Sequence, residues 1–251
     1  MATRALLYRR PAEPATLLVK HGSQFFAIRL RRHRRARRYT LRIHPSDREA
    51  ILTMPPRGTI VDAKDFAQRH GGWIAARLGR LPKAAPFHPG TVVPLRGVAH
   101  RIVHRAGLRG TVWTEVRDSG ERILCVAGGV EHIDRRVHDY LKRQARGELQ
   151  KAAQSYAHAL GVKVKRLSIR DQSSRWGSCT SAGSLSFSWR LILAPPYVLD
   201  YLAAHEVAHL VEMNHSARFW RVVARVCGHV ERAKTWLDTY GNDLHRYGIQ
   251  E

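Results

Sequence analysis

The sequence predicts an α+β protein of two regions, a β-rich basic region over residues 1–130 and a mixed region over residues 131–251. Three observations support this prediction. A chain of 251 residues is long enough for one large domain or two ordinary ones. Residues 86–129 are rich in Val, Thr and Ile between glycines, which is typical of strands and hairpins. From Glu131 onward the apolar residues instead recur at helical intervals, so we place the boundary there.

The N-terminal region combines a strand pattern with one helical pattern. The stretch "RRYTLRIHP" alternates between apolar and polar residues, which predicts a half-exposed strand that ends near Pro45. Residues 62–80 predict one helix, with Asp62 as its N-terminal cap. Two consecutive glycines, the first of them Gly71, weaken this helix.

The C-terminal region begins with a long helical pattern that starts at Glu131 and stops at Gly161. Residues 162–170 then predict a strand. Residues 184–193 alternate between large apolar residues and small or polar ones, which predicts a second strand. The next helix is expected to begin at Pro196, because a proline in the first helical turn loses no intrahelical hydrogen bond.

The positive charge of the chain is large and unevenly distributed. The chain has 43 Lys plus Arg against 20 Asp plus Glu, a formal charge of +23, and eight arginines fall within residues 29–42. Such an excess attracts anionic partners, and phosphate contacts with nucleic acid are one interpretation of this segment. The other interpretation is a solvated face that keeps the protein soluble. The salt dependence of binding separates the two.

The sequence predicts a soluble cytoplasmic protein without a membrane partner. Its first twenty residues are basic and interrupted by prolines, and they lack the apolar core of a secretory signal. The longest apolar run, residues 191–199, contains two prolines and is far shorter than the ~20 residues of a membrane span. The three cysteines form no Cys-x-x-Cys pair, which fits a reducing compartment. The oligomeric state is not indicated.

The run "HEVAH" places His205, Glu206 and His209 in a metal-binding pattern on the helix that begins near Pro196. Residues four apart lie on the same side of a helix, so both imidazoles can reach one ion while the glutamate lies beside it. Zinc takes neutral imidazoles as ligands and needs a nearby carboxylate to accept a proton from its bound water. The alternative is that these are core histidines, since their neighbours are apolar.

The charge pattern around these residues favours the metal interpretation. Residues 191–217 contain no Lys or Arg, although the chain as a whole is rich in both. A buried cation would repel a metal ion and weaken its binding. The missing positive charge can therefore be supplied by zinc.

A catalytic zinc ion needs a third protein ligand, and we predict that this ligand is His215. On an unbroken helix His215 would point away from His209, so the helix must end first. Asn214 could adopt the left-handed conformation that closes it, and Ser216 could then cap the next helix. The rival ligand is Glu212, which shares the helix face but lies roughly 10 Å along the axis from the first histidine at ~1.5 Å per residue.

The sequence resembles the YgjP-like metallopeptidase family, which is related to the SprT-like zinc proteases. The stretches that carry the resemblance are "RWGSC" (175–179), "FSWRLILAPP" (187–196), "HEVAHL" (205–210), "NHSARFW" (214–220) and, more weakly, "RRARRYTLRI" (34–43) and "GGWI" (71–74). It implies a zincin-like C-terminal domain, in which the active-site helix packs on a small mixed sheet, with His205, His209 and His215 as zinc ligands and Glu206 as the catalytic glutamate. Members of the family often have asparagine where this chain has Ser188.

These observations favour a zinc metallopeptidase that cleaves peptide bonds with a zinc-bound water and Glu206 as general base. Residues 184–193 are the candidate edge strand for an extended protein or peptide substrate. The candidate oxyanion stabilisers are Arg175, Arg190 and Tyr197. The resemblance to SprT-like proteases, which act on proteins bound to DNA, suggests nucleic-acid-associated substrates by analogy.

Two further interpretations stay open at this point. A zinc hydrolase for nucleotide phosphoanhydrides would use the same water, with arginines holding the phosphates. A nucleic-acid-binding protein with a purely structural zinc would have no hydrolytic activity, and Cys179 could then close the fourth position of the ion. Otherwise Cys179, like Trp176, is expected to be a packing residue.

Overall fold

The chain forms two compact units, Met1–Leu81 and Pro82–Glu251. The computed structural model describes residues 14–44, 47–108, 110–172 and 174–248. The end of the strand predicted near Pro45 lies outside the described residues. Among the described residues, no helix is both long enough and apolar enough to cross a bilayer.

The boundary between the units differs from the one predicted after residue 130. Strands within residues 92–127 belong to the second unit, because they share a core with the long helix that follows them. Leu124 and Val126 of these strands are buried in the same cluster as Val137 of the helix. The change from strand to helical periodicity therefore marks a change of element inside one core.

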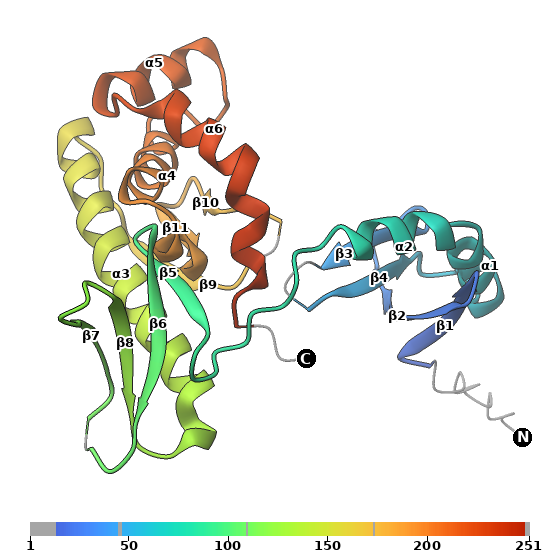
Figure 1. Cartoon of the computed structure of the whole chain (residues 1–251). Helices are drawn as coiled ribbons and strands as arrows, with labels where there is room; N and C mark the ends of the chain where they lie inside the picture. Colours follow the sequence, from blue (N-terminus) through green and yellow to red (C-terminus); the bar gives the residue numbers. More distant parts are fainter. Residues whose placement is uncertain (1–13, 45–46, 109, 173, 249–251) are drawn as a thin grey trace, which may run out of the picture. The chain divides into compact units, whose positions relative to one another are not determined.

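The first unit is a four-stranded sheet with two helices packed on one face (Figure 1). Its elements are β1 (Thr16–His21), β2 (Gln24–Arg32), β3 (Thr40–His44), β4 (Glu49–Met54), α1 (Ile60–Arg69) and α2 (Gly71–Gly79). The strand order is β1-β2-β4-β3, and only the central pair β2/β4 is parallel. Ile28, Leu52 and Ile74 are fully buried between the sheet and the helices.

The single helix predicted over residues 62–80 is in fact two helices that meet at His70. The N-terminal cap of α1 is Thr59, whose hydroxyl accepts a hydrogen bond from the Asp62 amide at 3.1 Å, so the cap predicted at Asp62 is wrong. The glycines allow α2 to approach β1 closely. A Cβ atom on Gly71 would lie 3.1 Å from the Cβ atom of His21.

The second unit begins with another four-stranded sheet and a long helix. These elements are β5 (Val92–Leu95), β6 (Val98–Arg105), β7 (Val112–Val116), β8 (Arg122–Ala127), the 3₁₀ helix η1 (Val130–His132) and α3 (Ile133–Leu160). The strand order β5-β6-β8-β7 repeats that of the first sheet, again with a parallel central pair. The strands and hairpins predicted over residues 86–129 and the helix predicted to stop at Gly161 are confirmed.

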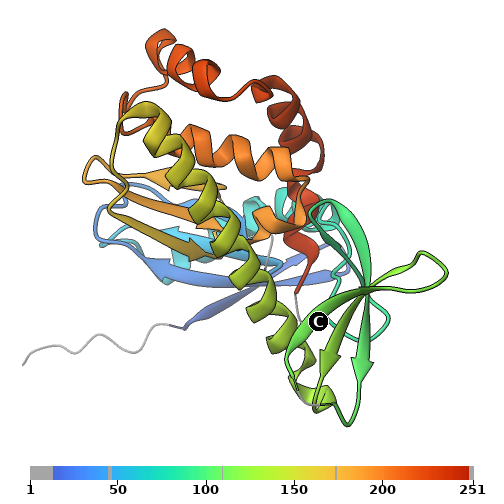
Figure 2. The same cartoon turned by 90° about the vertical axis from the view of Figure 1, so that its left-hand side faces the viewer.

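A small mixed sheet and a set of short helices complete the second unit. These are β9 (Arg166–Arg170), β10 (Gly177–Cys179), β11 (Ser184–Ser188), η2 (Trp189–Leu193), α4 (Pro196–Ala208), α5 (Ala217–Val226), α6 (Val230–Tyr240) and η3 (Gly241–Arg246). The strand order is β10-β11-β9. Figures 1 and 2 both show the sheet β5–β8 beside the N-terminal part of α3, and α4 and α5 beside its C-terminal part.

The strand predicted over residues 184–193 ends at Ser188 and lies in the middle of its sheet, so it is not an edge strand. Ser188 is fully buried, and its hydroxyl accepts a hydrogen bond from the Arg190 amide, which caps η2. The side chain of Arg190 is also buried and donates to the Asp171 carboxylate at 2.9 Å. The strand pattern extends over residues 189–193 because four of these five residues are large and apolar. They are apolar because all of η2 is buried.

The glycine that ends α3 and a glycine inside the helix are expected to respond in opposite ways to substitution by alanine. Gly161 has a φ of +65°, whereas Gly147 lies within the helix with open space around its Cα. We expect Gly161→Ala to lower the free energy of unfolding by about 1 kcal/mol, since a Cβ disfavours the left-handed conformation. Gly147→Ala should raise it by about 0.5–1 kcal/mol. Urea denaturation followed by circular dichroism measures both, and equal effects of the two substitutions would contradict this account.

Candidate metal centre

Helix α4 carries the first two histidines of the site through the middle of the second unit. It begins with Pro196 in its first turn, as predicted, and nine of its thirteen residues are buried. His205 and Glu206 lie in its last turn, and His209 is its C-terminal cap. A helix that is apolar on all sides packs within a core, so each of its few polar side chains needs a polar partner or a ligand there.

The chain leaves α4 immediately after the second histidine and returns toward it. The turn closes with hydrogen bonds from the Leu210 amide to the Val207 carbonyl and from the Ser216 amide to the Asn214 carbonyl. The left-handed conformation predicted for Asn214 is wrong, since its φ is not positive. The helix ends earlier than this residue, and the turn returns His215 to the first two histidines. Ser216 caps α5 as predicted.

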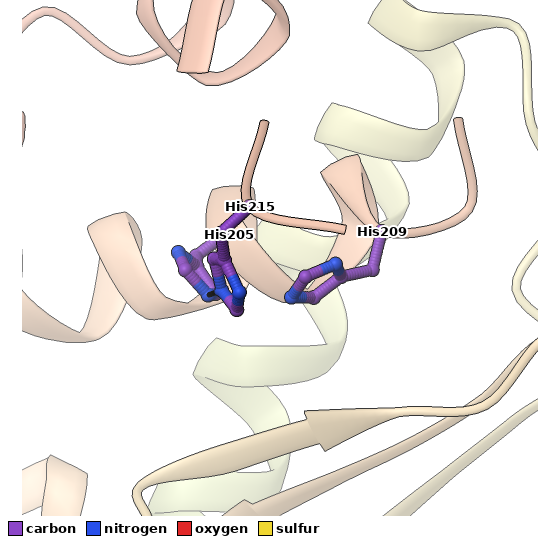
Figure 3. Close-up of side chains that lie close together, drawn as sticks. All are labelled: His205, His209 and His215. Carbon is purple, nitrogen blue, oxygen red and sulfur yellow. Dashed lines mark hydrogen bonds between the residues drawn. The ribbon is translucent and has the colours of Figure 1, made fainter. Parts of the chain in front are cut away.

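The three histidine rings converge on one point. Their ligating nitrogens all lie within 4.8 Å of one another, and the Nε2 atoms of His205 and His215 are 3.0 Å apart. Figure 3 shows the ring of His209 pointing toward the other two rings. Such spacing is what three ligands of one small ion require.

Burial lowers the pKa of two of these rings, those of His205 and His209. The pKa of His205 is lowered to about 4, first by burial and then by His209 and His215. The pKa of His209 is also lowered, mainly by burial. Neutral imidazoles have the lone pairs that a metal ion needs.

Neighbouring groups orient two of the rings. Nδ1 of His209 lies 3.2 Å from the Glu212 carbonyl oxygen and Nδ1 of His205 lies 3.5 Å from the Tyr201 hydroxyl oxygen. Contacts of this kind hold one ring nitrogen and leave the other free for a metal. Glu212, the rival candidate for the third ligand, therefore contacts His209 through its backbone. Glu212 contributes its backbone oxygen, while its carboxylate lies 3.8 Å from Arg218.

Phe219 forms an apolar base under the three rings, a role that the sequence analysis missed. Its ring centroid lies 4.9, 4.5 and 4.8 Å from those of His205, His209 and His215, and the side chain is fully buried. It sits on the first turn of α5, four residues after the last histidine. The signal in the sequence was the apolar stripe of α5, which showed a buried face but not what that face covers.

Glu206 is buried beside the histidines, with 5% of its surface exposed. Burial raises its pKa to about 7, and the charge of Arg175 opposes this shift. The carboxylate fits there because the facing residue of β10 has no side chain. A Cβ on Gly177 would lie 2.5 Å from Oε1 and 2.7 Å from Cγ of Glu206.

The donor set and its surroundings fit a divalent metal ion. Three imidazoles face one point, and the segment that carries them contains no Lys or Arg. The first cation after this segment, Arg218, has a 70% exposed side chain that faces Glu212. A donor set of three imidazoles is typical of zinc, and a catalytic zinc site keeps one position open.

The other side chains singled out from the sequence lie elsewhere or are engaged. Tyr197 lies under the guanidinium of Arg232, at 4.1 Å. The thiol of Cys179 is half-buried and does not join the histidine cluster, and burial raises its pKa to about 11. Trp176 stacks on His245 with centroids 5.0 Å apart, as expected of a packing residue. Of the three candidate oxyanion stabilisers, therefore, Arg175 alone acts on the charge of the buried glutamate.

The comparison with protein families agrees with this geometry. The family model of the YgjP-like metallopeptidase domain matches residues 37–240. No curated protein matches the chain. One solved structure, the metallopeptidase zymogen of Pyrococcus abyssi abylysin, is 24% identical, covers 39% of this chain and 97% of its own, and has a TM-score of 0.34. Because the family model spans most of the sequence, the chain belongs to the YgjP-like metallopeptidase family and is a metal-dependent peptidase.

Proposed function

We propose that this metallopeptidase hydrolyses peptide bonds of protein substrates with a zinc ion held by His205, His209 and His215 and with Glu206 as general base. The observation that supports this proposal is the convergence of three imidazoles beside a buried carboxylate. When bound, the zinc ion would supply a Lewis acid that polarises the scissile carbonyl and acidifies water.

In this mechanism Glu206 takes a proton from the attacking water and delivers it to the leaving amine nitrogen. The C–N bond breaks, and the products are a carboxyl group and an amine, so no covalent enzyme intermediate is formed. The buried position of Glu206 keeps bulk water away from the carboxylate. Arg175 is the protein group that would stabilise negative charge on the substrate carbonyl. Helix α4 itself has no Lys or Arg that could do so.

The substrate strand would pair with β10, which replaces the strand first considered over residues 184–193. β10 is an edge of the sheet β10-β11-β9, and among the described strands only β11 pairs with it. It also carries Gly177, whose Cα faces Glu206. An extended peptide added to this edge by main-chain hydrogen bonds would lie along the site.

The general-base role predicts the effect of Glu206→Gln. We expect this variant to fold and to keep its zinc content, because glutamine has the same shape and places no charge in the core. Its kcat/KM on an unfolded protein substrate should fall about 10²–10⁴-fold. His205→Ala/His209→Ala should instead lose zinc from this site. A Glu206→Gln variant that still cleaves protein would contradict the proposal, and so would a wild type that releases phosphate from nucleotides without cleaving protein.

The close approach of β10 to α4 predicts the effect of Gly177→Ala. The added methyl group displaces the Glu206 carboxylate, so peptidase activity should fall about 100-fold, as for other small misplacements of catalytic groups. Zinc content measured on the same sample should not change. Gly147→Ala is the matched control, because it adds the same methyl group in open space. Full activity of Gly177→Ala would show that Glu206 has room to move.

We further propose that the first unit binds single-stranded nucleic acid. The basis is a cleft of about 620 Å³ on the outer face of its sheet. The cleft is lined by Arg31, His33, Arg35, Ala36, Arg37, Arg38, Thr40, Arg42 and Thr53. The lining contains no carboxylate. Its five arginines form no ion pair with any described residue, whereas Arg29 nearby lies 2.9 Å from Glu49.

A second cleft, lined largely by aromatic residues, borders the first and shares Arg38 and Thr40 with it. Its lining is Arg38, Tyr39, Thr40, Leu41, Phe66, His70 and Trp73. Trp73 is 40% exposed. Unpaired arginines beside an exposed aromatic ring suit a strand whose phosphates meet the guanidinium groups and whose bases stack on the ring. Under this proposal the peptidase would act on proteins that are bound to the same nucleic-acid strand.

Oligonucleotide binding to the full chain carrying Glu206→Gln tests this assignment. With a labelled thymidine oligonucleotide, fluorescence anisotropy should show affinity that falls linearly on a log–log plot against salt. Arg35→Ala/Arg37→Ala should weaken binding at least tenfold, and Trp73→Ala about 5- to 150-fold, since stacking contributes about 1–3 kcal/mol per base. Lys64→Ala/Arg69→Ala is the control, because it removes the same charge outside both clefts.

The control decides whether the clefts matter. Equal weakening by both double variants would show attraction to net charge alone. Equal affinity for duplex and single strand, with no effect of Trp73→Ala, would contradict the stacking part of the proposal.

A further inference from the structure

A second cluster of ligating side chains lies at the opposite end of α5 from the histidine site. It consists of Asp200 on α4, Cys227 at the end of α5 and His229 at the start of α6. One ligand atom from each residue lies within 4.8 Å of the other two. Neither the peptidase mechanism nor the sequence analysis uses these residues.

The distances within the cluster suit a shared ion. Nε2 of His229 lies 3.1 Å from Oδ2 of Asp200 and 3.5 Å from Sγ of Cys227. At zinc bond lengths of about 2.0–2.3 Å, two tetrahedral ligands lie roughly 3.3–3.6 Å apart. The same nitrogen faces both partners, so the three atoms converge on one point. A nucleophilic Cys-His-Asp relay would instead need a different ring nitrogen for each partner.

The surroundings supply what a metal site needs besides its ligands. The Tyr156 hydroxyl on α3 donates a hydrogen bond of 2.5 Å to Oδ2 of Asp200, which fixes the carboxylate as outer groups fix metal ligands. A cleft of about 650 Å³ borders Cys227 and His229, so a solvent molecule can reach the cluster.

The cations that line this cleft are engaged with other groups. The Arg232 guanidinium lies 4.1 Å from the centre of the Tyr197 ring, and Lys234 is 3.1 Å from Oε1 of Glu231. Neither of these contacts involves a side chain of the cluster.

We propose that Asp200, Cys227 and His229 bind a second divalent transition-metal ion, and that zinc is the ion that this donor set fits best. Thiolate, imidazole and carboxylate are all zinc ligands, and a thiolate disfavours magnesium and calcium. Binding replaces the proton of the Cys227 thiol, which passes to solvent, and no electron is transferred. None of these three side chains takes part in the proposed peptidase mechanism.

The position of the cluster gives the ion a structural role. α5 begins two residues after His215 and ends at the residue before Cys227, so it is bracketed by the two clusters. Both clusters also include residues of α4 or its cap. An ion in each would fasten α5 to α4 at both of its ends, and would hold Phe219 under the histidine rings.

Cobalt(II) titration of the metal-free full chain tests this inference. A thiolate bound to cobalt produces a near-ultraviolet charge-transfer absorption that an all-histidine site does not produce. We expect this absorption in the wild type, its loss in Cys227→Ser, and its retention in His205→Ala/His209→Ala. Metal analysis after zinc loading should give two ions per chain in the wild type and one in each of these variants.

Two further variants keep the test decisive. Cys179→Ser is the matched control, because this thiol lies near Glu206 and must not be the source of the absorption. Asp200→Asn keeps an acceptor for Tyr156, and should weaken cobalt binding at this site at least tenfold even if Cys227→Ser fails to fold. The proposal is overturned if the wild type binds one ion that His205→Ala/His209→Ala removes, or if Cys179→Ser abolishes the absorption. The cluster would then be an Asp200–His229 ion pair only.

Discussion

The burial of α4 on all sides is the constraint on which the rest of the second unit depends. α3, α5, α6, β10 and η2 all pack against this helix. A polar side chain on such a helix is costly unless it finds a partner, so His205 and Glu206 are tolerated only where other groups meet them. His205 meets His209 and His215, and the Glu206 carboxylate occupies the space beside Gly177. Desolvation then lowers the pKa of His205 and raises the pKa of the Glu206 carboxyl.

The segment that carries the three histidines has no positive side chain of its own. Residues 191–217 carry no Lys or Arg, and the buried Arg190 just before them donates to Asp171 and to the Leu244 and Tyr247 carbonyls. Five arginines without an ion pair to any described residue line the cleft on the sheet of the first unit. Under the two proposals, a metal ion in the second unit and a polyanion in the first would each meet the charge that attracts it.

The sequence predicted local structure well where a pattern is confined to one element. The stop at Gly161 and the start at Pro196 follow from backbone preferences that neighbouring residues cannot change. It failed where packing chooses between two local solutions. Residues 189–193 continue a strand pattern but form a buried 3₁₀ helix. Residues 62–80 have one helical period but divide at His70, since the glycines after it approach β1.

For the site, the sequence by itself determined that His205 and His209 share one helix face with Glu206 beside them, because the helical repeat fixes side chains four residues apart. The sequence also favoured His215 over Glu212 as the third ligand, but only the tertiary structure brings its ring to the other two, since this depends on where packing ends α4 and turns the chain. The sequence does not show what Gly177 and Phe219 contact, nor that Asp200, Cys227 and His229 lie together. Their members lie on separate elements, and only the folded core brings them together.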